Sequence, residues 1–151
     1  MATVAETSAR RDGRVGYGSL AVALAGLAIS AYLTVEHYTA STLLACPESA
    51  TINCQKVTTS QWSHIGPVPV AVLGLGYFLA MTALCTPPAW RHPTLDRVRL
   101  VAAGAGVVSA VYLVWIELFR VGAICLWCTA VHVCTLALLA TVLWTTSARR
   151  P

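Results

Sequence analysis

Charged side chains are scarce in this sequence. Asp, Glu, Lys and Arg make up 11% of the 151 residues, whereas 57% of the residues are hydrophobic. A soluble globular domain carries roughly 25% charged residues. The composition therefore excludes an ordinary soluble domain and indicates a protein that lies in lipid. Internal repeats and low-complexity tracts are absent as well, so a single membrane domain accounts for nearly all of the chain.

A cleavable signal peptide is not expected either. The first apolar run, residues 17–37, is too long for the apolar region of a signal peptide, and no A-x-A-like cleavage site precedes a mature domain. We therefore expect this run to remain in the protein as its first membrane span.

Four apolar windows have lengths that suit a bilayer. Each is close to the roughly 20 residues that a spanning helix needs, and a helix satisfies its backbone hydrogen bonds internally, as hydrocarbon demands. The windows cover residues 17–37, 68–86, 100–119 and 121–144. The sequence thus predicts an all-α integral membrane protein, a four-transmembrane-helix bundle. Its membrane domain is expected at 16–146, between short tails at 1–15 and 147–151.

The basic residues are unevenly distributed, and this predicts the topology. If there are four spans, eight arginines fall on one side of the membrane: Arg10, Arg11, Arg14, Arg91, Arg97, Arg99, Arg149 and Arg150. The other side keeps Lys56 and Arg120. By the positive-inside rule, both termini and the 87–99 loop are cytoplasmic, and the 38–67 loop faces outward.

Four of the six cysteines form two pairs near the outward rim. Cys46 and Cys54 lie in the 38–67 loop, and Cys125 and Cys128 form a C-x-x-C motif where the last apolar window begins. Disulfides persist on the oxidising side of a membrane and are rare in the cytosol. Two further cysteines lack a partner at plausible spacing and are interpreted as apolar packing residues: Cys85 and Cys134.

The positions of the pairs suggest thiol chemistry. Residues i and i+3 share a helix face, so Cys125 and Cys128 are spaced for a disulfide. The start of a helix favours a thiolate, and C-x-x-C thiols in such settings often have lowered pKa values. Spacing also allows a disulfide between Cys46 and Cys54, although sequence does not prove connectivity. If the loop folds over the last span, Cys54 reaches Cys125 and electrons pass between the pairs by thiol–disulfide exchange.

Two other interpretations of the cysteines stay open. A membrane scaffold with two static disulfides would use the same four residues without redox chemistry. A zinc site is less favoured, because zinc sites usually have two tight pairs of ligands and a seven-residue gap is wide for one. We therefore predict no metal site.

His132 is a candidate for ligand binding. It follows Cys128 by four residues and Cys125 by seven, so the three share a face of the last helix. A histidine inside the membrane is a functional candidate by default. It would donate a hydrogen bond either to a neighbouring helix or to a quinone carbonyl.

Two further titratable positions lie near the outward rim. Glu117 is close to the outward end of the third window, where a carboxylate is costly, so it has either a hydrogen-bonded structural role or a role in proton handling. The first window ends near Glu36 and His37. These residues either mark a helix end that meets water or assist proton release near the loop.

The cysteines stand in a recognisable sequence context. The motifs are Cys46-x7-Cys54, the run QKVTTSQW at 55–62, the opening GPVPVAVLG at 66–74, and Cys125-Leu126-Trp127-Cys128 at the start of the last window. With this order, the chain resembles the vitamin K epoxide reductase family over most of residues 17–145. The 66–74 opening resembles the bacterial branch of that family.

The resemblance implies a four-helix bundle that encloses a quinone, menaquinone or ubiquinone, under the cysteine loop. Cys46 would exchange with an outside partner, Cys54 would bridge transiently to Cys125, and Cys128 would face the quinone. Bacterial members oxidise a thioredoxin-like protein of the DsbA type, here a separate polypeptide, and fill the role of the unrelated DsbB proteins. The resemblance also implies a multi-pass protein of the bacterial inner (cytoplasmic) membrane, with its loop in the periplasm.

Two departures from the family concern the quinone end. Animal members have a Tyr four residues after the last cysteine, where this chain has His132. They also have an Asn in the cap over the quinone, for which the shorter loop here offers no equivalent.

Together with the cysteine pairs, the resemblance predicts a thiol:quinone oxidoreductase. The alternative enzyme is a quinone or vitamin K epoxide reductase that recycles quinone, which differs in the direction of electron flux.

Overall fold

A computed structural model describes residues 4–39, 46–47 and 49–148, with side chains from residue 16 onward. Within these ranges the chain is mainly helical, and the one sheet is a two-stranded hairpin. In chain order the elements are α1 (Val4–Thr39), α2 (Cys54–Thr58), a 3-10 turn (Gln61–Ser63), β1 (His64–Ile65), β2 (Val68–Pro69), α3 (Val70–Leu84), a second 3-10 turn (Ala89–Arg91), α4 (Thr94–Ile116), a π-helical turn (Glu117–Val121) and α5 (Leu126–Ala148).

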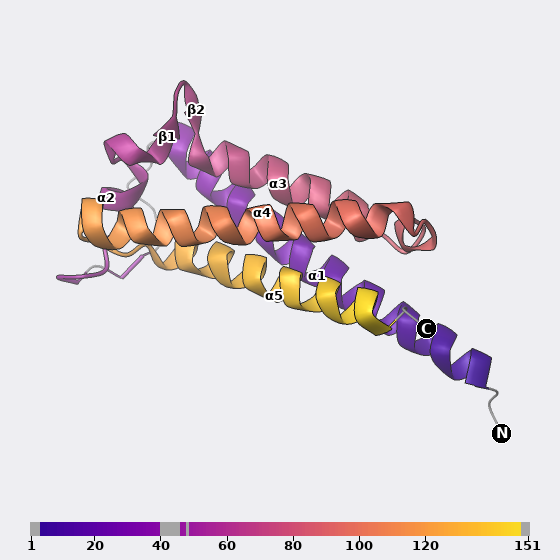
Figure 1. The fold of residues 1–151 in the computed structure, drawn as a ribbon. Coiled ribbons are helices and arrows are strands. Elements are labelled where there is room, and N and C mark those ends of the chain that lie inside the picture. The colour runs from indigo at the N-terminus through magenta and orange to yellow at the C-terminus, as the bar shows by residue number, and fades with distance from the viewer. Residues whose placement is uncertain (1–3, 40–45, 48, 149–151) are drawn as a thin grey trace.

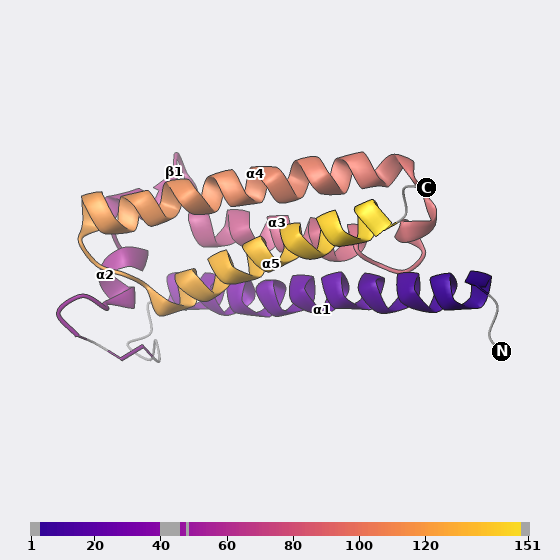
Figure 2. The same cartoon turned by 60° about the horizontal axis from the view of Figure 1, so that its bottom comes forward.

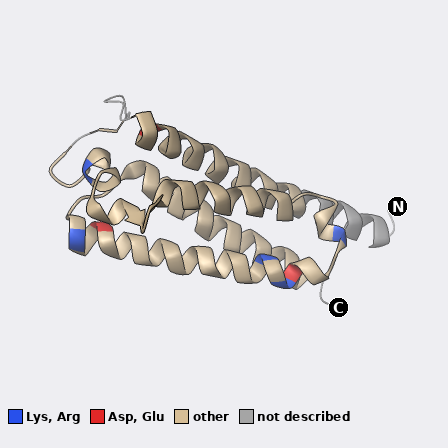
Figure 3. Cartoon of the chain, turned by 90° about the horizontal axis from the view of Figure 1, so that it is seen from above, with Lys and Arg blue, Asp and Glu red and all other residues tan. Residues whose placement is uncertain are grey.

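The four longer helices lie lengthwise against one another, and the connections gather at the two ends. Figures 1 and 2 show α2 and the hairpin at one end of the bundle, and the start of α1 and the end of α5 near the other. We call these the loop end and the terminal end. Figure 3 shows that the basic residues lie near the two ends of the bundle, with none in the middle of the part that it describes. This distribution leaves the central band of the bundle apolar, as a bilayer requires.

Among the described residues, three helical stretches are long and apolar enough to cross a membrane: Gly16–Thr39, Thr94–Val121 and Leu126–Ala148. This agrees with a multi-pass membrane protein. The second apolar window, 68–86, forms the shorter helix α3, which at 1.5 Å per residue is about 22 Å long. A hydrocarbon core is about 30 Å thick. The count of four spans therefore stays a prediction.

The hairpin explains why α3 is short. Val68 and Pro69 pair with β1 instead of opening the helix, and Pro69 becomes its N-cap residue. Gly66 has a φ of 62°, at the first of the two central turn positions. Glycine takes this conformation without steric cost, and a two-residue hairpin turn needs it.

The junction between α4 and α5 also differs from the expected span boundary. The last window was expected to begin at Val121, but α5 begins at Leu126. A π-helical turn continues α4 to Val121, and Gly122 then ends it with a left-handed φ of 64°. Three non-helical residues, 123–125, separate this glycine from α5. The extended segment places Cys125 immediately before the helix.

The core lies between α1, α3, α4 and α5 and continues to the terminal end. Its buried residues are Ala23, Phe78, Met81, Cys85, Trp90, Ala103, Leu138 and Val142. At the terminal end, Arg99 is fully buried. Its Nε donates to the Leu84 carbonyl over 2.7 Å, its guanidinium pairs with Asp96, and its Cζ lies 3.9 Å from the Trp90 ring centroid. Arg99 therefore joins the end of α3 to the start of α4.

Close packing of α1 on α3 generates a prediction for stability. A Cβ on Gly26 would lie 2.1 Å from Cε1 of Phe78, which is buried. Gly26→Ala should lower the free energy of unfolding by about 1–3 kcal/mol, because the Phe78 ring must shift in a packed core. Thermal unfolding in detergent measures the effect. Gly18→Ala is the matched control on α1, since nothing lies within 4 Å of its Cβ. Equal melting temperatures for the two variants would contradict the packing described.

Candidate active site

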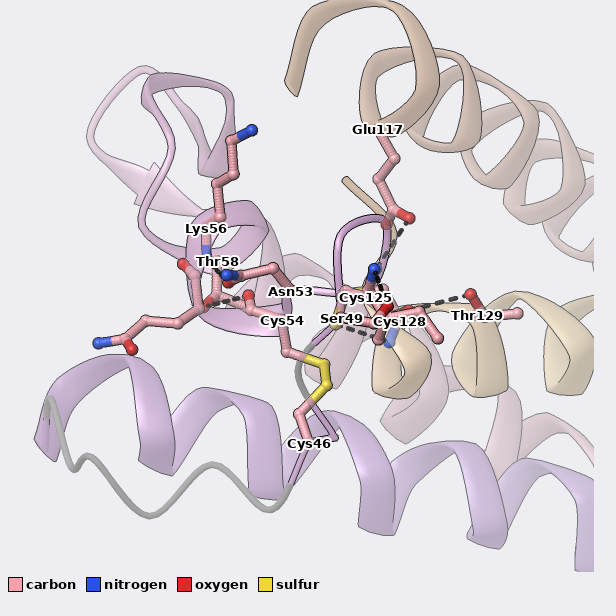
Figure 4. The surroundings of a disulfide bond; sticks show 12 residues. Cys46, Ser49, Asn53, Cys54, Lys56, Thr58, Glu117, Cys125, Cys128 and Thr129 are labelled. Carbon is pink, nitrogen blue, oxygen red and sulfur yellow. Dashed lines mark hydrogen bonds between the residues drawn. A yellow bond between two sulfur atoms is a disulfide. The ribbon is translucent and has the colours of Figure 1, made fainter. Parts of the chain in front are cut away.

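The loop cysteines are joined by a disulfide at the loop end of the bundle. Cys46 and Cys54 have Cα atoms 6.2 Å apart and bonded sulfurs, as Figure 4 shows. Cys54 is the first residue of α2 and is almost completely buried, whereas Cys46 is half-buried. The Asn53 side chain accepts a hydrogen bond from the Lys56 N–H over 2.7 Å and caps α2. The cap fixes Cys54 at the start of α2, and its disulfide partner Cys46 is the more exposed of the two.

The loop is held against the start of α5 by backbone hydrogen bonds. The Asn53 N–H donates to the Ile124 carbonyl over 3.1 Å, and the Ile124 N–H donates to the Thr51 carbonyl over 2.9 Å. Ile52 and Ile124 thus form an isolated parallel bridge. The next residues along the two paired segments are Cys54 and Cys125. Figure 4 shows the disulfide and the C-x-x-C motif in one neighbourhood.

Cys125 and Cys128 are free thiols at the start of α5. Cys125 is fully buried, and its Sγ accepts a hydrogen bond from the Cys128 N–H over 3.2 Å, as a helix-capping side chain does. A hydrogen bond from the Cys128 thiol, helped by the N–H groups of Cys128 and Trp127, lowers the pKa of Cys125 below that of an ordinary thiol. Cys125 is therefore the more acidic thiol of the pair.

Glu117 lies beside this pair. It is the first residue of the π-helical turn, is 5% exposed, and accepts a hydrogen bond at Oε2 from the Cys125 N–H over 3.3 Å. Its backbone carbonyl accepts from the Ala123 N–H over 3.2 Å. Single π-turns within α-helices are frequent at functional sites. The side chain and the backbone of one residue thus hold the connection that leads into α5.

A cavity of about 340 Å³ lies within the bundle next to these groups. Cys128, His132 and Glu117 line it, and most of the remaining lining is apolar. Ligand pockets typically combine an apolar wall with a few placed polar groups. The cavity therefore has the composition expected of a binding site for an apolar molecule that carries a few polar atoms.

Three buried polar atoms among the cavity-lining residues have no hydrogen-bond partner within the described part of the chain. They are the Ser30 hydroxyl, the Tyr77 hydroxyl and Nδ1 of His132. Buried polar groups normally have partners, so each exception needs an explanation. A quinone combines an apolar ring with carbonyl oxygens that accept hydrogen bonds. The residues present fit such a molecule.

Tyr77 reaches its position because α4 has no side chain where the two helices meet. A Cβ on Gly106 would lie 2.3 Å from the Tyr77 hydroxyl and 3.0 Å from Cγ2 of Thr135. Thr135 lies one turn beyond His132 on α5. Nothing in the sequence singles out Ser30, Tyr77 or Gly106, because small residues and an isolated tyrosine are common in apolar helices.

The segment after α2 covers the cavity on the loop side. Trp62 lines the cavity, and Cζ of Arg120 lies 5.4 Å from its ring centroid and 5.3 Å from that of Trp115. These are cation–π distances. Arg120 thus joins the loop to the end of α4.

The other residues singled out in the sequence take different positions. His37 lines the cavity and lies 4.9 Å, ring to ring, from His64, whereas Glu36 is not among the lining residues. Cys85 is buried in the core and Cys134 is half-buried, both as free thiols. Of the three titratable residues Glu36, His37 and Glu117, the last two therefore reach the cavity.

Comparison with known proteins identifies the family of the chain. No curated protein sequence matches the chain. Residues 19–143, which include all four paired cysteines and His132, match the model of the vitamin K epoxide reductase family. The match covers most of the sequence and confirms the resemblance drawn from the cysteine motifs. The chain belongs to the vitamin K epoxide reductase family.

Proposed function

We propose that this protein is a bacterial membrane thiol:quinone oxidoreductase. It reoxidises an exported thioredoxin-like partner of the DsbA type and passes the electrons to menaquinone or ubiquinone, which supports disulfide formation in exported proteins. Family membership implies oxidoreductase chemistry on disulfides and quinones in general. The relay, the partner and the acceptor are the proposal.

One observation gives the strongest support for the relay. Backbone pairing of residues 51–53 with Ile124 places Cys54 and Cys125 at adjacent ends of the two paired segments. Cys54 belongs to the loop disulfide, and Cys125 belongs to the C-x-x-C pair. Thiol–disulfide exchange requires one sulfur to approach another along an accessible path. The pairing supplies that proximity.

The steps follow from the positions of the sulfurs. A partner thiolate attacks Cys46, the more open end of the loop disulfide, and Cys54 leaves as a thiolate. Cys54 attacks Cys125 in the oxidised C-x-x-C pair, and Cys128 leaves as a thiolate at the cavity. A second partner thiol attacks the partner–Cys46 disulfide, which completes the partner's own disulfide and frees Cys46. The Cys46 thiolate then attacks Cys54, which re-forms the loop disulfide and leaves Cys125 and Cys128 reduced. The quinone, when bound, supplies a two-electron, two-proton acceptor.

The cavity residues have separate tasks in this scheme. Cys128 lines the cavity, where its sulfur would meet the quinone. His132 would donate a hydrogen bond to one carbonyl oxygen of the quinone, and the Tyr77 hydroxyl would hold the molecule farther along the bundle. Trp62 and Arg120 close the loop side and keep water away from the thiolate.

The proposed orientation places the loop end outside the cytoplasm. Among the described residues, Arg91, Arg97 and Arg99 lie at the terminal end, and Lys56 and Arg120 lie at the loop end. The positive-inside rule then places the termini in the cytoplasm and the cysteine loop in the periplasm or extracytoplasmic space. The disulfide would lie in the compartment where disulfides persist.

The first prediction about activity concerns Cys128. Cys128→Ala should reduce dithiothreitol-driven reduction of a short-chain menaquinone or ubiquinone analogue to the uncatalysed background, because no thiol then faces the cavity. Quinone absorbance in detergent measures the rate. Cys134→Ala is the matched control on α5 and should keep wild-type activity. Normal turnover by the Cys128→Ala protein would refute the relay and favour a scaffold with static disulfides.

A second prediction concerns His132. His132→Phe keeps an aromatic ring but removes the hydrogen-bond donor, so KM for the quinone analogue should rise about five-fold, the equivalent of one hydrogen bond of about 1 kcal/mol. His132→Tyr restores a donor and should recover part of the loss. Unchanged kinetics in His132→Phe would remove His132 from the quinone site.

A third prediction concerns the contact between Gly106 and Tyr77. Gly106→Ala places a Cβ against the Tyr77 hydroxyl and should weaken binding of the quinone analogue, measured by quenching of tryptophan fluorescence. Gly104→Ala adds the same methyl group on α4 where nothing lies within 4 Å, so it should bind normally. Equal affinity in both variants would show that the Tyr77 position is not needed for binding.

A further inference from the structure

Glu117 takes no part in the proposed thiol–disulfide exchange between the cysteines. Its position in the structure is nevertheless unusual. Its carboxyl group is buried near the outward end of an apolar helix, where an ionisable side chain is costly. It contacts the backbone of Cys125 and lines the cavity next to Cys128 and His132. One carboxyl group therefore reaches both the backbone of the buried Cys125 and the cavity.

The surroundings of Glu117 do not balance its charge. Within the described residues no ion pair includes this side chain, and the nearby Arg120 guanidinium lies over the rings of Trp62 and Trp115. The π-helical turn begins at Glu117, and Figure 4 shows its side chain directed toward Cys125. A carboxyl group without a fixed countercharge is suited to gain and lose a proton.

We propose that Glu117 is the proton carrier between Cys125 and the quinone in the cavity. This inference rests on the proposed function and deepens it. Cys125 is fully buried and is not among the cavity-lining residues, so its proton needs an intermediate acceptor. Glu117 is the carboxyl group that contacts Cys125 and also lines the cavity.

The step balances in atoms and electrons. In the reduced protein Glu117 holds the proton of the acidic Cys125 thiol as an O–H bond. When Cys125 and Cys128 form their disulfide, this O–H bond and the S–H bond of Cys128 break, one S–S bond forms, and two electrons and two protons leave for the quinone, which is reduced to the quinol. Glu117 delivers its proton to one quinol oxygen. Cys128 lines the cavity and delivers its proton there directly.

A purely structural role for Glu117 makes a different prediction. Its Oε2 caps the Cys125 N–H, and a glutamine oxygen accepts the same hydrogen bond. Glutamine cannot carry a proton. Glu117→Gln therefore separates capping from proton transfer, and Glu117→Ala removes both.

The test uses the full-length protein in detergent with a short-chain menaquinone analogue. Glu117→Gln should slow quinone reduction by the reduced C-x-x-C pair about 100-fold, the lower range for loss of a general acid–base group. Affinity for the analogue and exchange between the loop and C-x-x-C pairs should remain at wild-type values. Glu36→Gln is the matched control, because it removes a carboxylate at the same end that does not line the cavity.

An infrared measurement without quinone gives an independent readout. The difference spectrum between protein reduced with dithiothreitol and protein oxidised with diamide should contain a carboxylic-acid C=O band in the reduced state. This band should disappear in Glu117→Gln and persist in Glu36→Gln. A band that persists in Glu117→Gln would overturn the proposal.

The kinetic outcomes are equally decisive. Wild-type turnover in Glu117→Gln with a loss confined to Glu117→Ala would mean that Glu117 only caps α5. A parallel loss of thiol–disulfide exchange in Glu117→Gln would mean that it only positions Cys125. If the wild-type protein reduces no quinone, the proposed function itself fails, and the role of Glu117 falls with it.

Discussion

Two backbone hydrogen bonds between the cysteine loop and Ile124 are the interaction on which the rest of the site depends. They join residues 51–53 to the segment that leads into α5, and they fix Cys54 beside Cys125. Each such bond contributes only about 0.5–1.5 kcal/mol net, yet leaving a buried N–H or carbonyl unpaired costs more. The loop is thus held in one register. A disulfide in a loop without this register would have no defined position relative to the second cysteine pair.

The segment between α4 and α5 serves several purposes at once. Gly122 ends α4 in a left-handed conformation, which leaves the backbone of Ile124 free to pair with the loop. The preceding π-turn directs the Glu117 carboxyl group to the N–H of Cys125. Cys125 then caps α5 through its sulfur. The loop contact, the carboxyl group and the acidic thiol therefore depend on the same short connection, and a change in its length would disturb all three.

Much of this arrangement could be predicted from the sequence, and the remainder has a physical explanation. Apolar windows identify helices reliably, and Cys125-x-x-Cys128 at a helix start predicts an acidic thiol. The contact with Ile124 could not be predicted, because backbone groups make it and any residue supplies them. The Tyr77 position depends on the absence of a side chain at Gly106, which only the packing of α3 on α4 reveals. The short α3 follows from the Gly66 turn, whose hairpin removes Val68 and Pro69 from the helix.

The proposed relay requires electrons to cross from the loop pair to the C-x-x-C pair through Cys54 and Cys125. The decisive measurement is a disulfide map of the protein, quenched with N-ethylmaleimide during turnover with dithiothreitol and a short-chain quinone analogue. We expect a disulfide between Cys54 and Cys125 that accumulates during turnover and disappears when the reductant is exhausted. A map that contains only the Cys46–Cys54 and Cys125–Cys128 bonds at every time point would contradict it.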